Sequence, residues 1–236
     1  MIYIAISLLI CIFAHQKKQN MKKAFLFTLV AVLVANMAMA QIRFNGYAVG
    51  AFSDRVSSYY DSKNNFNGQV NGGFIWGGGF EYMAHKYYGI ELFYNRMDTK
   101  APMTYSYGSP NINKTNFDLG INQIMVGFNR YFPTMNSKIE PYAGFCLGLS
   151  IFDVKNPDNG NSTSATKFGY GFRTGVNIWA SKKVALKLQG QLFSAAQSVG
   201  GGFYFGTGGG GAGISTYSTF FQFGLGGGLV FKLAEH

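Results

Sequence analysis

The chain has 236 residues, with 20 Lys or Arg, 10 Asp or Glu and a formal net charge of +10. Aromatic residues make up 17% of it, charged residues only 13%, and Gly occurs 32 times. The basic residues are scattered rather than clustered, so we expect no nucleic-acid partner.

The N-terminal part, residues 21–40, has the three regions of a cleavable signal peptide. Lys22 and Lys23 precede an apolar run that is too short to cross a bilayer as a helix. An A-x-A cleavage site follows, formed by Ala38 and Ala40 directly before Gln41. We therefore predict that the mature chain comprises residues 41–236.

Residues 1–20 hold a second apolar run, Ile2–Ala14, with no basic residue before it. We interpret this segment as an upstream extension, with translation starting at Met21. The alternative is a lipoprotein signal ending at Cys11. Such a signal requires small residues before its cysteine, whereas Leu9 and Ile10 stand there.

The mature chain lacks the features of two other classes of exported protein. No segment reaches eighteen consecutive apolar residues, so no transmembrane helix is expected. Cys146 is the only cysteine after Ala40, so no intramolecular disulfide is expected. Abundant aromatic and Gly residues with few charges are typical of strands whose outer face contacts lipid.

Eight segments alternate between apolar and small or polar residues with the period of a β-strand. In chain order they are 42–53, 70–83, 90–97, 117–132, 139–151, 168–179, 183–193 and 220–233. Segment 42–53 has weak contrast between its faces, and segment 117–132 changes phase. A β-bulge near Asn122 would restore its facing, and a wrongly assigned strand is the alternative. The pattern predicts an all-β fold, an eight-stranded antiparallel up-and-down transmembrane barrel.

The predicted connections alternate strictly between short and long. The short ones are 84–88, 133–138 and 180–182, and the long ones are 54–68, 98–116, 153–166 and 199–217. Membrane barrels of bacteria have short periplasmic turns and long outer loops. We therefore expect four extracellular loops and both chain termini in the periplasm.

The last strand contains a Gly followed by two spaced apolar residues, Gly228, Phe231 and Leu233. This run resembles a C-terminal barrel-assembly signal, although three further residues follow it. The stretches GFNRYF (127–132) and EPYAGFCLGLS (140–150) resemble small outer-membrane β-barrel domain proteins, the OmpA/OmpX/OmpW-like group of the porin-like superfamily.

The resemblance implies a location in the outer membrane of a Gram-negative cell. It also implies contact with outer-membrane lipid and lipopolysaccharide, and with the barrel-assembly machinery during biogenesis. It does not identify a surface ligand.

The mature chain offers no recognisable catalytic set. Lipid-modifying barrels need a nucleophile with a His base near the outer leaflet. The only candidates are His85, in a predicted short turn, and the terminal His236. We therefore expect no enzyme, no cofactor and no metal. The Gly-rich string 206–211 lacks the βαβ context of a dinucleotide site.

Aromatic residues in the last long connection have two interpretations. Phe203, Tyr204 and Phe205 either contact a lipid or protein partner or cap the rim of the barrel.

Alternation turns a set of charged residues into the lumen, near its periplasmic end except for Arg173, which is expected deeper. The set is Glu81, Glu91, Glu140, Arg173, Lys187 and Lys232, with Arg43 as a further candidate. Charges in a narrow lumen must pair, because burying them alone is costly. Large inward side chains that are candidates to fill the remaining space are Phe93, Tyr142, Trp179 and Phe193.

Two interpretations of the charge network remain open, a structural plug and a gate or selectivity filter. The first favours a non-enzymatic barrel with a structural or surface-interaction role exerted through four outer loops. The alternative is a narrow passive channel for small or apolar solutes.

Overall fold

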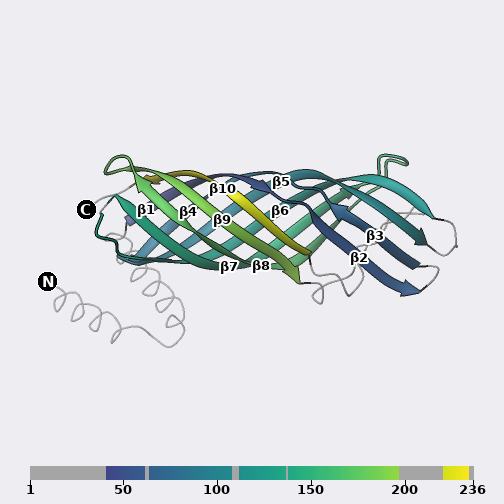
Figure 1. Cartoon of the computed structure of the whole chain (residues 1–236), viewed down its shortest axis with the longest axis horizontal. Helices are drawn as coiled ribbons and strands as arrows, with labels where there is room; N and C mark the ends of the chain where they lie inside the picture. Colours follow the sequence, from purple (N-terminus) through teal and green to yellow (C-terminus); the bar gives the residue numbers. More distant parts are fainter. Residues whose placement is uncertain (1–40, 62–63, 108–111, 137, 197–219, 234–236) are drawn as a thin grey trace, which may run out of the picture. The chain divides into compact units, whose positions relative to one another are not determined.

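The computed structural model describes residues 41–61, 64–107, 112–136, 138–196 and 220–233 (Figure 1). Among these residues there is no helix with the length and apolar character needed to cross a membrane. Several predicted features lie outside the described residues: the signal peptide with Ala38 and Ala40, the aromatics Phe203, Tyr204 and Phe205, the string 206–211, and His236.

Ten strands make up a single antiparallel sheet. They are β1 (Gln41–Ala51), β2 (Asp54–Asp61), β3 (Asn64–Val70), β4 (Gly73–His85), β5 (Tyr88–Tyr107), β6 (Asn113–Tyr131), β7 (Ile139–Lys155), β8 (Ser162–Trp179), β9 (Val184–Ala196) and β10 (Phe220–Lys232). Eight of them form a ring in the order β5-β4-β1-β10-β9-β8-β7-β6, which the pairing of β5 with β6 closes. The predicted eight-stranded up-and-down barrel is thus confirmed.

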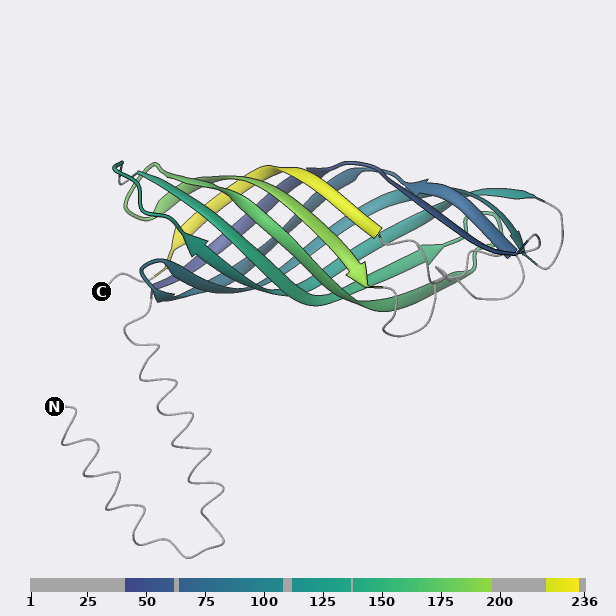
Figure 2. The ribbon, with the colours of Figure 1, turned by 60° about the horizontal axis from the view of Figure 1, so that its bottom comes forward.

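The two ends of the ring differ in their connections. Residues 86–87, 132–138 and 180–183 link its strands at one end, which we call the turn end. The opposite end, which we call the loop end, carries the β2–β3 hairpin and the connections 108–112, 156–161 and 197–219. Figure 2 shows the start of β1 and the end of β10 together at the turn end, close to the short turns.

Three segments that we expected to be loops contain strand instead. Residues 54–68 form the β2–β3 hairpin, whose second strand pairs with Met103–Tyr107 of β5 beyond the ring. Most of 98–116 extends β5 and β6, and the ends of 153–166 extend β7 and β8. The expectation failed because it equated polar sequence with loop. The connection 199–217 lies outside the described residues.

The phase change in β6 has a different cause from the bulge that we expected near Asn122. Pairing of β6 with β5 and β7 runs through this position with no register shift. Phe117, Leu119 and Ile121 are 2–5% exposed and point inward, whereas Ile124, Val126 and Phe128 are 38–44% exposed and point outward. The prediction of a bulge is therefore wrong, and the two faces of the strand exchange polarity instead.

The same exchange occurs on the neighbouring strands. On β5, Tyr94 points outward on the turn-end side of the exchange, and Asp98 points outward on its loop-end side. On β7 the corresponding outward residues are Leu149 and Asp153. The loop-end half of the barrel is therefore apolar inside and polar outside, as in a protein surrounded by water. Its interior is a core of buried side chains that includes Val49, Met97, Leu119, Phe152 and Val154.

Candidate functional site: the charged layer of the lumen

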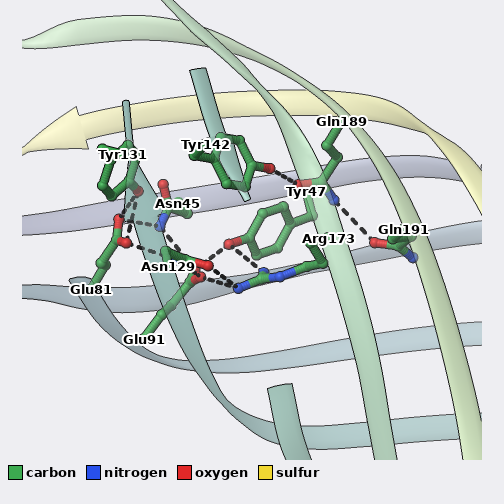
Figure 3. Close-up of polar contacts among 10 residues, drawn as sticks. All are labelled: Asn45, Tyr47, Glu81, Glu91, Asn129, Tyr131, Tyr142, Arg173, Gln189 and Gln191. Carbon is green, nitrogen blue, oxygen red and sulfur yellow. Dashed lines mark hydrogen bonds and ion pairs between the residues drawn. The ribbon is translucent and has the colours of Figure 1, made fainter. Parts of the chain in front are cut away.

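Six charged side chains from six strands meet inside the turn-end half of the barrel. We call them the charged layer: Arg43 of β1, Glu81 of β4, Glu91 of β5, Glu140 of β7, Arg173 of β8 and Lys187 of β9. All except Glu140 are at most 3% exposed. Alternation places them there, because each occupies an inward position of its strand. Figure 3 shows part of the layer.

One ion pair crosses the lumen completely. Arg43 Nη1 donates to Glu140 Oε2 at 2.9 Å, and Arg43 Nη2 donates to Glu140 Oε1 at 3.1 Å. In the eight-stranded ring, β1 and β7 are four strands apart in either direction, so they face each other. This two-pronged geometry is the strongest form of Arg–carboxylate contact. The pair therefore spans the full width of the lumen.

A second pair joins Arg173 to Glu91, with Nη2 at 2.6 Å from Oε2. The hydroxyl of Tyr47 also donates to Glu91, and Asn45 Nδ2 does so at 2.8 Å. The Arg173 guanidinium carbon lies 4.1 Å from the ring centroid of Phe93. The ion pair and these hydrogen bonds thus replace the hydration that the Glu91 carboxylate loses on burial (Figure 3).

Glu81 stands directly opposite Glu91 on the neighbouring strand, a like-charge pair that would be destabilising alone. Tyr131 donates its hydroxyl to both oxygens of Glu81 at 2.7 Å. The side-chain amides of Asn45 and Asn129 each donate to Glu81 and to Glu91. Uncharged donors therefore hold the two acids together.

The two lysines of the predicted network lie over aromatic rings. Lys187 Nζ is 4.7 Å from the ring centroid of Tyr142 and 5.5 Å from that of Tyr47. Lys232 Nζ is 4.3 Å from the ring of Trp179, on the turn-end side of the layer. Cation–π contact offsets part of the cost of removing an ammonium group from water.

Sequence reasoning missed most of the uncharged partners. Asn45, Tyr47, Asn129 and Tyr131 occupy inward positions on β1 and β6, level with the charges. Asn45 and Tyr47 could have been found from the sequence, because they alternate with Arg43 on β1 and so share its inward face. The weak contrast between the two faces of that strand obscured this pattern.

Side chains fill the lumen on both sides of the charged layer. Tyr47, Phe93, Met125, Cys146 and Phe193 form a buried cluster in the lumen. Met83, Tyr131 and Tyr142 form another one. Three of the four large residues proposed as filling, Phe93, Tyr142 and Phe193, are thus buried members of these clusters, and Trp179 packs in a further one with Ala185 and Val230.

Inward glycines leave the space that the charged layer occupies. A Cβ atom added at Gly89 would lie 2.2 Å from Glu81 Oε1, and one at Gly127 would lie 2.7 Å from Arg173 Nη2. The hydrogen-bonding partners of Glu81 and Arg173 lie at the same level of the lumen. These two charged groups therefore have little freedom to move away from an added Cβ atom.

Gly89→Ala is therefore expected to lower the unfolding free energy by about 1–3 kcal/mol through overpacking. Gly46→Ala is the matched control, because a Cβ there meets nothing within 4 Å. Equilibrium urea unfolding of the refolded barrel measures both. Equal unfolding free energies of the two variants would show that packing of the charged layer does not require the space left by Gly89.

The residues of the suggested assembly signal lie at the seam between β1 and β10, the first and last strands of the ring. Gly228 pairs with Tyr47 of β1 and Lys187 of β9. The ring of Phe231 packs 6.4 Å from that of Phe44, and Leu233 is exposed just after β10. Recognition by an assembly machinery stays a prediction.

The described residues contain no group of three or more His, Cys, Asp or Glu side chains that could hold a metal ion. His85 lies exposed at the turn end and accepts a hydrogen bond from the backbone nitrogen of Tyr87 at 3.3 Å. It packs against the rings of Tyr87 and Tyr88.

Comparison with known proteins agrees with this architecture. The family model described as "Outer membrane protein beta-barrel domain" matches residues 25–196. No curated protein matches the chain. Among solved structures, the chain is similar to Neisserial surface protein A (NspA), with 17% identity and a TM-score of 0.54, over 82% of this chain and 97% of that one. It is also similar to the outer membrane protein OprG from Pseudomonas aeruginosa, with 14% identity and a TM-score of 0.55, over 83% and 97% of the two chains. At such identities the likeness concerns the fold alone.

Proposed function

Because the chain belongs to the outer membrane protein β-barrel domain family and so resides in the outer membrane, we propose that it is a non-enzymatic barrel with a closed lumen. Its role is then structural or is exerted through the surface that the loop end presents. The short turns face the periplasm and the loop end faces the outside, in keeping with the asymmetry of such barrels.

The observation that carries this proposal is the ion pair between Arg43 and Glu140, which connects opposite strands of the ring. Eight strands enclose an interior just wide enough for side chains to fill. The pair crosses that interior at one level, and buried clusters fill it at others. An ion would have to break several charge-assisted bonds to pass.

The loop-end half supports the second element of the proposal. The outer wall of this half is polar and extends beyond the apolar outer wall of the turn-end half. The ion pairs Arg96–Asp98 and Lys100–Asp118 lie on this polar outer face of β5 and β6. The β2–β3 hairpin enlarges this extension. A water-facing platform of paired strands is suited to contact with molecules outside the cell.

The described residues also argue against catalysis at that platform. His85 is their only histidine, and it lies at the turn end. A site at the outer leaflet would therefore lack the imidazole base that acyl-transfer chemistry commonly uses.

In planar bilayers the refolded protein is expected to show no discrete openings. The double variant Arg43→Ala/Glu140→Ala removes the pair that spans the lumen and is expected to give stable steps of conductance. Arg96→Ala/Asp98→Ala is the matched control, because it removes an equally charged pair from the outer wall. Stable openings of the unsubstituted protein would overturn the closed lumen.

The second candidate function is a narrow passive channel for small or apolar solutes. One observation favours it: Lys187 Nζ and Arg173 Nε are buried and make no hydrogen bond within the described residues. Buried groups of this kind usually bind water, which would provide a hydrated path beside the charged layer. Openings with unsubstituted protein would select this candidate.

A further inference from the structure

The charges of the barrel are distributed unevenly along its axis. Among the described residues, the loop-end half has as many Lys and Arg residues as Asp residues: Arg55, Arg96, Lys100, Lys114, Lys155 and Lys167 beside Asp54, Asp61, Asp98, Asp118, Asp153 and Asp158. All three described Glu residues belong to the charged layer. At the turn end the described residues outside the lumen include five cations and no acid: Lys86, Arg130, Lys138, Lys182 and Lys183. We call these five the basic rim.

Backbone hydrogen bonds tie the segments of the basic rim into one arc. The nitrogen of Tyr131 donates to the carbonyl of Tyr87 at 2.9 Å, which joins the end of β6 to the turn that holds Lys86. The nitrogen of Trp179 donates to the carbonyl of Lys138 at 2.8 Å, which joins the second turn to the end of β8. The rim therefore runs from the β4–β5 turn to the β8–β9 turn (Figure 2).

Arg130 fixes the level of the rim relative to lipid. It continues the outward stripe of β6 directly after Val126 and Phe128. Its guanidinium carbon lies 5.2 Å from the ring centroid of Tyr88 and 5.6 Å from that of Phe132. These rings are 45% and 42% exposed. A cation at the end of a lipid-facing stripe, held among exposed rings, lies at the level of lipid headgroups.

The neighbouring turn repeats this arrangement. Lys86 Nζ lies 5.5 Å from the ring centroid of Tyr87, and His85 packs against both Tyr87 and Tyr88. Aromatic rings thus lie beside two of the five cations, Lys86 and Arg130, whose side chains stay exposed and accessible to a headgroup.

We propose that the basic rim binds the phosphate headgroups of anionic phospholipids in the leaflet at the turn end. This inference rests on the membrane location and orientation of the proposed function, which make this leaflet the periplasmic one. Five cations without an acid among them repel one another, and anionic phosphates relieve that repulsion. Contact with the rings at the lipid boundary favours a lipid headgroup over a polymer located farther from the membrane.

The test uses the full protein refolded into phosphatidylcholine vesicles that contain a trace of spin-labelled lipid. The immobilised fraction of the spectrum gives the relative association of phosphatidylglycerol and phosphatidylcholine. We expect a preference for phosphatidylglycerol of about fivefold for the strongest contacts at low salt. It should fall toward unity near 1 M salt, where the screening length is about 3 Å.

The variant Lys86→Gln/Arg130→Gln is expected to lose most of this preference. Arg96→Gln/Lys100→Gln removes the same charge from the outer wall of the loop-end half and is expected to keep it. Equal association of both lipids with the unsubstituted protein, or an unchanged preference in the rim variant, would overturn the proposal. Binding to purified peptidoglycan that requires the rim, with no lipid preference, would also overturn it.

Lipid preference does not depend on the state of the lumen, so the two proposals fail separately. A barrel that conducts ions and still prefers phosphatidylglycerol contradicts the closed lumen alone. A silent barrel without any lipid preference contradicts the basic rim alone.

Discussion

Arg173→Met is expected to destabilise the barrel by about 3–5 kcal/mol, the usual cost of leaving one partner of a buried ion pair without its counter-charge. Glu91 would stay fully buried on β5, opposite Glu81, with the guanidinium at 2.6 Å removed. The donors from Asn45 and Tyr47 would remain, but hydrogen bonds alone do not neutralise two neighbouring carboxylates.

Urea unfolding of the barrel in vesicles, followed by tryptophan fluorescence, measures this effect. The double variant Arg173→Met/Glu91→Gln is expected to regain most of the lost stability, because it removes the unpaired charge and keeps the side-chain volumes. Arg96→Met is the control for loss of an exposed pair and is expected to cost about 1 kcal/mol or less. A loss below 1 kcal/mol for Arg173→Met would show that the pair does not stabilise the lumen.

Leu147→Arg is expected to cost about 2–4 kcal/mol, as for a basic residue placed near the middle of the lipid-facing wall of a membrane barrel. Leu147 lies on the outward face of β7 between Phe145 and Leu149, all of them exposed. The exchange of polarity predicts a different outcome only a few residues farther along the same face. Asp153→Arg is expected to change the stability by about 0.5 kcal/mol or less, because that position faces water.

The same unfolding measurement in vesicles compares the two variants. Large losses of stability, about 2–4 kcal/mol, at both positions would mean that lipid reaches Asp153. The exchange of polarity would then not mark the edge of the bilayer. Similar and negligible losses would mean that lipid does not contact Leu147.

The alternation of the sequence was sufficient to predict the ring, because a strand with lipid on one side and a lumen on the other has a clear period of two. It was insufficient at the loop end, where water replaces lipid. Outward residues such as Asp98, Asp118 and Asp153 are polar there, and polar sequence was interpreted as loop. In β6 the same change of solvent at Asn122 imitated a bulge.

The inward charges could be predicted individually, but their partners could not. The alternation of each strand places Glu140 and Arg43 in the lumen. Their contact, however, depends on the stagger of opposite strands, which cannot be predicted from the local sequence pattern. Glu81 has donors from Asn45, Asn129 and Tyr131, which composition does not distinguish from other polar residues. Their importance became visible only once the register of β1, β4 and β6 was known.

The span of the Arg43–Glu140 contact has a consequence for the order in which the barrel can form. The two residues are 97 positions apart, and Arg173 and Tyr47 are 126 apart. An open sheet that lacks the β1–β10 seam holds these groups apart, so water must hydrate them until the seam forms. Closure and dehydration of the lumen are therefore one cooperative event, and an unfinished barrel carries a row of solvated charges that opposes its entry into lipid.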